Sequence, residues 1–168
     1  MRIRDHSASI GLRNELVGRR HRALPGAVAT GASCCVELEP IGIVRSELRN
    51  RKNAPRSPAD GAPSAVLDIE ERFAPALEGV EVGSELIVLT WLHEGVRDVL
   101  QVNPGRDKTR PLTGVFAGRS PDRPNPIGLH RVTVTAIQPP AKVHVAALEA
   151  IDGTPILDLK IAFGSTER

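Results

Sequence analysis

Residues 114–129 read GVFAGRSPDRPNPIGL, a run in which three prolines and three glycines are interspersed with two arginines and an asparagine. Such a run is not a helix, because each proline lacks a backbone N–H and biases the preceding residue toward extended geometry. The apolar residues Val115 and Phe116 before the prolines, and Ile127 and Leu129 after them, distinguish the run from a flexible linker. It predicts a stiff, anchored loop that presents its arginines and asparagine for binding, or else a rigid turn between strands.

Short apolar or alternating segments recur along the chain, separated by turns rich in Pro and Gly. Residues 85–92 are a continuous apolar run, typical of a strand buried on both faces. Residues 131–137 alternate, with Thr133 and Thr135 opposite the aliphatic face. The expected strands are residues 41–44, 65–69, 85–92, 98–102, 131–137, 142–148 and 156–161, and residues 73–80 are expected to form one or two helical turns. This pattern predicts an all-β fold, a closed or nearly closed β-barrel of short strands with long Pro/Gly-rich loops.

The 168 residues suit a single domain, but their charge is unevenly distributed. Residues 1–24 contain six arginines and two acidic residues, a local balance of +4 in a chain whose formal net charge is +2. We interpret residues 1–36 as a basic, poorly ordered extension, residues 37–164 as the barrel domain and residues 165–168 as a tail. The domain itself is not strongly basic, which argues against a general nucleic-acid binder.

Several classes of protein lack support in the sequence. No apolar run approaches the ~20 residues of a membrane span, and no apolar signal core follows the N-terminus, so a cytoplasmic location without membrane attachment is expected. Cys34 and Cys35 are adjacent and two thiols are not a zinc set, so no metal is expected. His93-Glu94 is followed by Arg97 where a zinc-protease helix needs its second histidine, and no nucleotide-binding glycine motif, P-loop or nucleophile elbow is present.

Four polar clusters remain as candidates for a binding site. Each also has a plain structural interpretation: a solvated basic loop around Arg56, a structural histidine at His93, a rigid turn around Arg119, and a hairpin turn over residues 152–155. The clusters are Pro55-Arg56-Ser57 in a long Pro-rich loop, His93-Glu94 after the apolar run, the opening loop with Arg119, and Asp152-Gly153-Thr154-Pro155 between two apolar segments.

Taken in chain order, these clusters and the opening run resemble the TsaA-like family, which includes tRNA methyltransferase O. The resemblance covers about residues 38–161, and its RPNPIG element is highly specific because so proline-rich a run seldom arises by chance. The segments that carry it are IGIVRS at 41–46, PR at 55–56, LHE at 92–94, GVFAGRS at 114–120, RPNPIGL at 123–129 and DGTPILDLK at 152–160.

The resemblance implies a barrel that forms a homodimer and binds the cofactor S-adenosyl-L-methionine near the subunit interface. It implies a methyltransferase whose substrate is tRNA, with methyl transfer to the exocyclic nitrogen of threonylcarbamoyladenosine next to the anticodon. The cofactor contacts fall on the matching positions Pro55, Arg56, Ser57, His93, Glu94, Arg119, Leu129, Asp152, Gly153, Thr154 and Pro155.

Two departures from the family pattern keep other acceptors open. Residues 158–163 read DLKIAF where family members often continue with Asp-Ile-Lys-Pro-Tyr. Because the sequence ends at Arg168, we expect it to lack the additional C-terminal domain of bacterial members that act on tRNA. One alternative is a methyltransferase that uses the same cofactor on a small metabolite or another RNA. The other is a non-enzymatic RNA-binding β-barrel with residues 1–24 as a basic arm.

Methyl transfer from this cofactor requires little covalent participation by the protein. Methyl transfer needs the acceptor in line with the sulfonium–methyl bond and water excluded, and positioning supplies several kcal/mol of barrier reduction by itself. Arg56 or Arg119 suits the cofactor's carboxylate through charge-assisted hydrogen bonds. A base that assists loss of the acceptor's proton has three candidates among which the sequence does not choose: His93, Glu94 and Asp152.

Overall fold

The structure, a computed structural model, describes residues 37–163; the predicted extension and tail lie outside the described residues. Among the described residues, strands are joined by loops and short 3-10 helices, and no helix there is long and apolar enough to span a membrane. The predominance of strands confirms the all-β prediction. The elements are β1 (Gly42–Arg45), η1 (Pro58–Asp60), β2 (Ala65–Ile69), η2 (Glu71–Leu77), β3 (Glu85–Trp91), β4 (Gln101–Val102), η3 (Pro104–Arg106), β5 (Thr113–Gly114), η4 (Val115–Ala117), β6 (Ile127–Gln138), β7 (Lys142–Ala146) and β8 (Pro155–Ile161).

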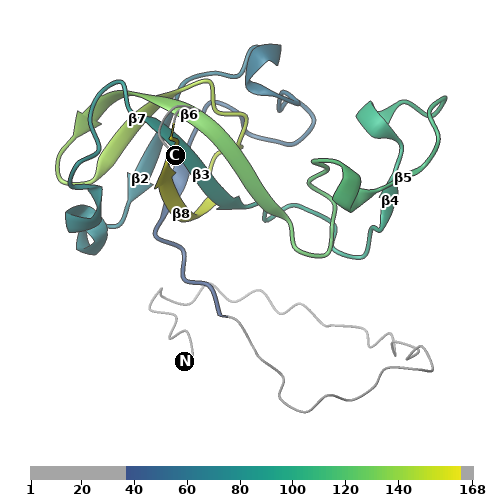
Figure 1. The fold of residues 1–168 in the computed structure, drawn as a ribbon, viewed down its shortest axis with the longest axis horizontal. Helices are drawn as coiled ribbons and strands as arrows, with labels where there is room; N and C mark the ends of the chain where they lie inside the picture. The colour runs from purple at the N-terminus through teal and green to yellow at the C-terminus, as the bar shows by residue number, and fades with distance from the viewer. Residues whose placement is uncertain (1–36, 164–168) are drawn as a thin grey trace. The chain divides into compact units, whose positions relative to one another are not determined.

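Six strands close into an antiparallel barrel in the order β1-β2-β7-β6-β3-β8, with β8 paired again to β1 (Figure 1). Strand β6 is the longest, at 12 residues. It pairs with β3 through its first half and with β7 through its second half, where the register shifts between Val134 and Ala136. The closing pair is short: β1 and β8 are in register only at Gly42 with Ile156 and at Ile43 with Pro155.

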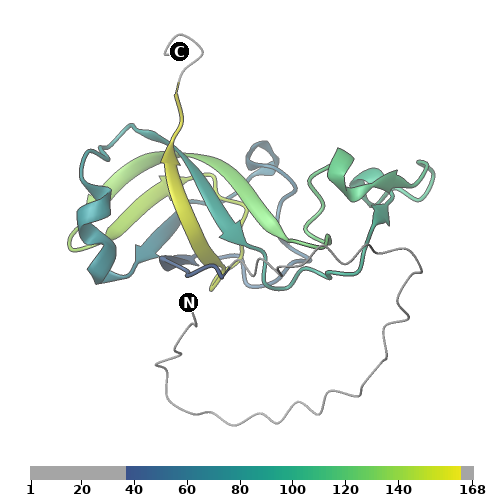
Figure 2. The same cartoon turned by 60° about the horizontal axis from the view of Figure 1, so that its bottom comes forward.

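Alternating side chains build the barrel core. On β6, Val132 and Val134 are buried while Thr133 and Thr135 are exposed, which confirms the predicted alternation. Helix η2 packs Phe73 against the core, at the barrel end where β2 finishes (Figure 2). The helix has 3-10 geometry and contains Pro75, which has no N–H to contribute to an α-helical ladder.

Three details of the strand prediction are wrong. Strand β3 is not buried on both faces: Leu86, Val88 and Thr90 are buried, and the residues between them are only half-buried. Residues 98–102 yield only β4, which pairs with β5 in a separate two-stranded sheet beside the barrel (Figures 1 and 2). Strand β6 is longer than predicted because it already begins at Ile127, inside the opening run.

The turn at residues 152–155 is not a hairpin turn. Strands β7 and β8 flank it in sequence, yet β7 pairs with β2 and β6, whereas β8 pairs with β1 and β3. The connection therefore crosses one end of the barrel, and it hydrogen-bonds to Val44 in β1 and to Leu48 in the segment that follows β1.

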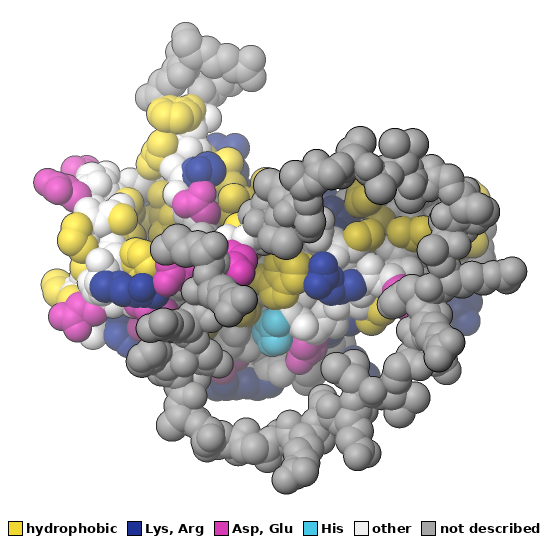
Figure 3. Space-filling model, turned by 90° about the horizontal axis from the view of Figure 1, so that it is seen from below, with side chains coloured by type: hydrophobic (Ala, Val, Ile, Leu, Met, Phe, Trp, Pro, Cys, Tyr) yellow, Lys and Arg dark blue, Asp and Glu magenta, His cyan; other side chains and the backbone are white. Residues whose placement is uncertain are grey.

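The outer surface of β3 and β6 is apolar near the start of β6. Ile127 and Leu129 are 42% and 50% exposed, and they stand opposite the half-buried Trp91 and Leu89 in the strand register. Seen from below, hydrophobic side chains on the described surface lie beside a cationic and a histidine side chain (Figure 3). A contiguous apolar surface of this kind is a candidate contact surface for another molecule.

Candidate functional site

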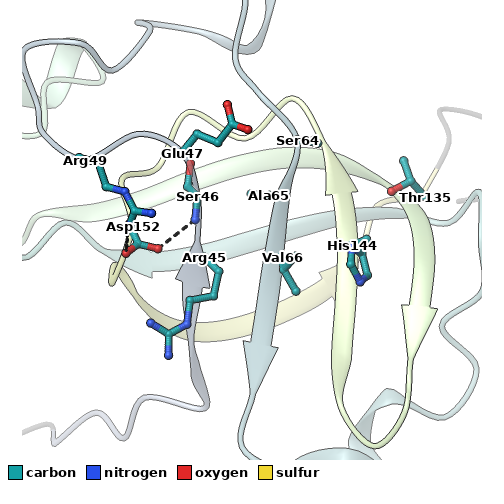
Figure 4. A pocket seen from close by; sticks show the side chains of 10 residues that line it. All are labelled: Arg45, Ser46, Glu47, Arg49, Ser64, Ala65, Val66, Thr135, His144 and Asp152. Carbon is teal, nitrogen blue, oxygen red and sulfur yellow. Dashed lines mark hydrogen bonds and ion pairs between the residues drawn. The ribbon is translucent and has the colours of Figure 1, made fainter.

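The segment after β1 holds the Asp152 turn in place. The N–H of Ser46 donates to Asp152 Oδ1 at 3.0 Å, and Arg49 Nη1 donates to Oδ2 at 2.5 Å (Figure 4). In return the N–H of Asp152 donates to the carbonyl of Leu48 at 2.7 Å. Both carboxylate oxygens of Asp152 therefore already accept hydrogen bonds, and its first role is structural.

The remainder of the turn is fixed mainly through its backbone. The N–H of Gly153 donates to Val44, whose own N–H donates to the carbonyl of Thr154 at 2.9 Å. Thr154 is buried and its hydroxyl donates to Ile151, so its side chain is directed inward. Gly153 has a φ of 76° and open space where a Cβ would lie. The carbonyls of Asp152 and Gly153 accept no hydrogen bond from the described residues, which leaves them available to a ligand.

Arg51 connects the same segment to two other predicted clusters. Its Nη1 donates to the carbonyl of Glu94 and its Nη2 to Asp122 Oδ1, both at 2.7 Å. Asp122 Oδ1 also accepts the N–H of Val96 at 2.8 Å. Residues 46–51 thus bond to the Asp152 turn at one end, and at the other end to the strand β3 exit and the proline-rich run.

The proline-rich run holds its shape through Arg123, contrary to the expectation that both arginines are displayed. Arg123 donates to the carbonyls of Ser120 and Val115, at 2.8 and 2.6 Å, and also to that of Gly118. Because its guanidinium donates to three carbonyls of the loop, Arg123 stabilises the loop itself and is not presented to a ligand. Arg119 is exposed, and no hydrogen bond or ion pair is recorded for its side chain among the described residues, so it is the arginine that the loop presents.

Asn125 is not simply displayed either. Its Oδ1 lies 3.4 Å from Arg97 Nη2, at the long limit of a hydrogen bond, and Arg97 Nε donates to Pro124 at 2.9 Å. The Arg97 guanidinium also lies 5.4 Å from the centre of the Trp91 ring. Arg97 thus fastens the run to the end of β3.

The other predicted cofactor contacts differ in their exposure and in their hydrogen bonds. Arg56, His93 and Glu94 are exposed, and their side chains have no hydrogen-bond partner among the described residues. Ser57 instead donates to Asp60 Oδ2 at 2.9 Å. No contact recorded among the described residues joins Arg56, Arg119 or Leu129 to the Asp152 turn. Pro55 is half-buried, and Pro155 begins β8 opposite Ile43.

Two concavities flank residues 46–53. One of about 680 Å³ is lined by Asn50, Arg51, Lys52 and Glu94. The other, of about 550 Å³, lies on the outer surface of the barrel, where Arg45, Val66 and His144 stand in a row across β1, β2 and β7 (Figure 4). Its complete lining is Arg45, Ser46, Glu47, Arg49, Ser64, Ala65, Val66, Thr135, His144 and Asp152.

Two carboxyl groups have shifted pKa values. Partial burial opposes ionisation of Asp68, but hydrogen bonds and charge from Lys142 and Arg45 outweigh it and hold the pKa below its ordinary value. Hydrogen bonds from the side chain and backbone of Thr109 lower the pKa of Asp107. Within residues 37–163, no group of three His, Cys, Asp or Glu residues is placed to hold a metal ion.

A buried hydrogen-bonded chain, which the sequence did not reveal, lies inside the barrel wall. Thr90 Oγ1 is 2.9 Å from His130 Nε2, and His130 Nδ1 is 2.8 Å from Glu149 Oε1. A Cβ at Gly128 would lie 2.3 Å from the Thr90 hydroxyl and 2.5 Å from Nε2, so only glycine leaves room for this pair.

Ser46, Arg49, Arg51 and Asp122 are the other site residues that the sequence did not single out. Their pairings join residues up to 106 positions apart, and no spacing rule indicates such contacts. The one available signal was the position of Asp122 inside the proline-rich run.

Comparisons with known proteins show the family to which the chain is similar. The family model for the tRNA-methyltransferase O N-terminal domain matches residues 43–165. The "Probable S-adenosyl-L-methionine-binding protein VirR" of Rhizobium radiobacter is 40% identical over 120 residues, which cover 71% of this chain and 67% of the relative. An S-adenosyl-L-methionine-binding protein of Archaeoglobus fulgidus is 37% identical over 124 residues, 73% of this chain and 86% of that one.

A crystal structure of TrmO from Pseudomonas aeruginosa superimposes with a TM-score of 0.61 at 27% identity. The match covers 79% of this chain and 58% of that one, so the chain spans less than two thirds of the solved protein.

Proposed function

Because the chain belongs to the tRNA-methyltransferase O N-terminal domain family, we propose that it is an S-adenosyl-L-methionine-dependent methyltransferase that methylates the exocyclic nitrogen of threonylcarbamoyladenosine beside the anticodon of tRNA. One observation carries the proposal: residues 46–51 hydrogen-bond to Asp152 through Ser46 and Arg49, and to Glu94 and Asp122 through Arg51. Clusters that lie far apart in sequence are thereby joined through one short segment. A tRNA substrate also favours a cytoplasmic location.

The residues present fit this cofactor. The exposed guanidinium groups of Arg56 and Arg119 have no partner among the described residues and suit its carboxylate. The open carbonyls of Asp152 and Gly153 suit an amino group of the adenine, since Gly153 lets a ligand approach closely. Leu129 offers an apolar surface, and Glu94 an exposed negative charge for the ammonium or sulfonium group. Pro55, Ser57, His93, Thr154 and Pro155 complete the proposed contacts.

When bound, S-adenosyl-L-methionine supplies an electrophilic methyl group on a sulfonium centre. The protein's contribution is then to orient and to exclude water, and preorganised geometry supplies several kcal/mol of the barrier reduction. Arg51, Arg97 and Arg123 serve this role because they fix the backbone that bears Glu94 and Arg119.

The acceptor nitrogen must lose a proton during methyl transfer, and three residues were candidates to take it. Asp152 is the least suited, because Ser46 and Arg49 already occupy both of its oxygens. The side chains of His93 and Glu94 are exposed and accept no hydrogen bond from the described residues, so either is free to receive the proton.

A homodimer would complete the site. Leu129 lies on the outer surface of β6, where it is 50% exposed, whereas Thr154 is directed into the barrel. A ligand that touches Leu129 would remain in solvent on this face unless a second chain covered it. The apolar surface formed by Ile127, Leu129, Leu89 and Trp91 suits a second copy of the chain.

Nucleoside mass spectrometry tests the proposed identity of the methyl acceptor. The purified full chain is incubated with S-adenosyl-L-methionine carrying an isotopically labelled methyl group and with tRNA that contains threonylcarbamoyladenosine. Labelled methyl on that nucleoside is the expected result. Cofactor binding without label in any nucleoside would reject tRNA as the substrate and favour a small-metabolite acceptor. Salt-dependent RNA binding without cofactor binding would favour a non-enzymatic barrel.

A further inference from the structure

The buried chain of Thr90, His130 and Glu149 lies at the barrel end that carries the Asp152 turn. Thr90 pairs in register with Ile156, the second residue of β8, and the turn directly precedes β8. Each ring nitrogen of His130 has one partner in this chain: Nδ1 lies 2.8 Å from Glu149 Oε1 and Nε2 lies 2.9 Å from the Thr90 hydroxyl. Thr90 is fully buried, so this chain does not serve as a nucleophile with its base.

Glu149 belongs to the segment that leads from β7 into the Asp152 turn. That segment begins at Ala147, whose φ of 54° is uncommon for a residue with a side chain. Leu148 and Ala150, on either side of Glu149, are buried in the core, and the N–H of Leu148 donates to Pro63 at 3.0 Å. The hydrogen bond to the buried His130 holds the Glu149 carboxylate inward, three residues before Asp152.

The pairing leaves one polar atom unsatisfied. Glu149 Oε2 is buried and accepts no hydrogen bond from the described residues. A buried carboxylate oxygen without a partner is costly. Stability alone gives little reason to keep such an arrangement, since apolar side chains of the same volume would leave no polar atom unsatisfied.

We propose that His130 and Glu149 are positioning residues for cofactor binding. Their hydrogen bond sets the separation between β6, where Leu129 adjoins His130, and the turn that begins at Asp152. These are two of the proposed contact regions, and no hydrogen bond recorded among the described residues links their side chains directly. The inference rests on the proposed function, because the spacing matters to binding only if both regions touch the cofactor.

The test is calorimetric titration of S-adenosyl-L-methionine into the full chain and three variants. Glu149→Ala removes the acceptor and is expected to raise Kd on the order of tenfold, because displaced contact groups lose their alignment. Glu149→Gln keeps a carbonyl oxygen for the imidazole N–H and is expected to recover most of the affinity. The matched control is Glu85→Ala, which removes the partner of Arg131, the exposed residue next to His130; its Kd should equal that of the unmodified chain.

A purely structural role gives a different result. Glu149→Ala would then lower the fraction of binding-competent protein, seen as reduced stoichiometry, while the Kd of the folded fraction stayed within twofold of the unmodified chain. That outcome overturns the proposal, as does an equal loss of affinity in Glu149→Gln. Failure of the unmodified chain to bind would instead reject the proposed function, so the two failures are distinguishable. Hydrogen exchange is the second readout: faster exchange over residues 147–154 is expected in Glu149→Ala and not in Glu149→Gln.

Discussion

Arg51 donates a hydrogen bond of 2.7 Å to Asp122, which lies 71 positions further along the chain. Both side chains are 28% exposed, and the same guanidinium also donates to the carbonyl of Glu94. A half-buried pair of this kind is held more firmly than an exposed ion pair. It ties the proline-rich run to the exit of β3 and to the segment after β1, which makes Arg51 the central link of the candidate site.

Replacement of Arg51 is expected to weaken cofactor binding without unfolding the barrel. Arg51→Ala removes both hydrogen bonds, and Kd for S-adenosyl-L-methionine should rise on the order of tenfold as Glu94 and the run lose their alignment. The Kd of Arg51→Lys should lie between those of the unmodified chain and Arg51→Ala, because an ammonium group does not reproduce the paired donors of a guanidinium group. Calorimetry measures both, with Arg72→Ala as control, since Arg72 pairs with Glu70 at the other end of the barrel. Unchanged affinity in Arg51→Ala would show that the hydrogen bonds of Arg51 are not needed for cofactor binding.

Arg119 is expected to contribute directly to binding. Arg119→Ala should cost about 1.5–3 kcal/mol of cofactor binding energy, the usual range for a hydrogen bond to a charged group. Because Arg119 is exposed, its replacement should change the free energy of unfolding little. Arg110→Ala, another exposed arginine, serves as the control. Equal affinities for the two variants would contradict the assignment of Arg119.

Gly128 is expected to tolerate no side chain. In Gly128→Ala the new methyl group would meet the Thr90 hydroxyl at 2.3 Å, so the free energy of unfolding should fall by about 1–3 kcal/mol. Gly114→Ala is the matched control, because nothing lies within 4 Å of a Cβ there. Denaturant titrations that gave the same stability for both variants would contradict the packing described around His130.

Asp68 is expected to make part of the stability pH-dependent. Lys142 and Arg45 lower its pKa in the folded chain, so its ionised form stabilises the fold above the unfolded-state pKa of about 3.9. That contribution is lost as the pH falls through the lower, folded-state pKa. Asp68→Asn should therefore cost about 1 kcal/mol or less at pH 7 and nothing in strong acid. A stability difference that did not vary with pH would exclude this ion pair as its source.

The apolar surface of β3 and β6 is expected to be the dimer interface. Ile127→Glu places a charge on this surface and should convert the proposed dimer to monomer in sedimentation experiments, since burial of an unpaired charge is unfavourable. Val82→Glu is the control, because Val82 is also an exposed apolar residue, in the turn before β3. A dimer that survived Ile127→Glu would have to use another surface.

The strands were predictable where a local pattern fixes them. Residues 65–69 were predicted with the correct bounds, and the alternation along β6 was correct, because side chains on a strand alternate with a period of two. Pairing was not predictable from such patterns. Residues 98–102 carry a strand-like pattern, but which strand they join depends on the path of the chain after Trp91, and they pair outside the barrel.

The candidate site was predictable only from motifs. The resemblance assigned Glu94, Arg119 and Asp152 to the cofactor site. Nothing in the sequence distinguished Arg49 and Arg51 from the other basic residues of the loop around Arg56. In the fold, Arg49 pairs with Asp152 and Arg51 with Asp122, because the segment that bears them runs between those two residues. Contacts of such long range follow from the closed barrel and not from any local spacing.

The most direct test of the central claim is calorimetric titration of S-adenosyl-L-methionine into the full chain. We expect saturable binding with one cofactor per chain, weakened by Arg119→Ala and Arg51→Ala and unaffected by Arg72→Ala. Absence of binding by the unmodified chain, or equal binding by all four proteins, would contradict it.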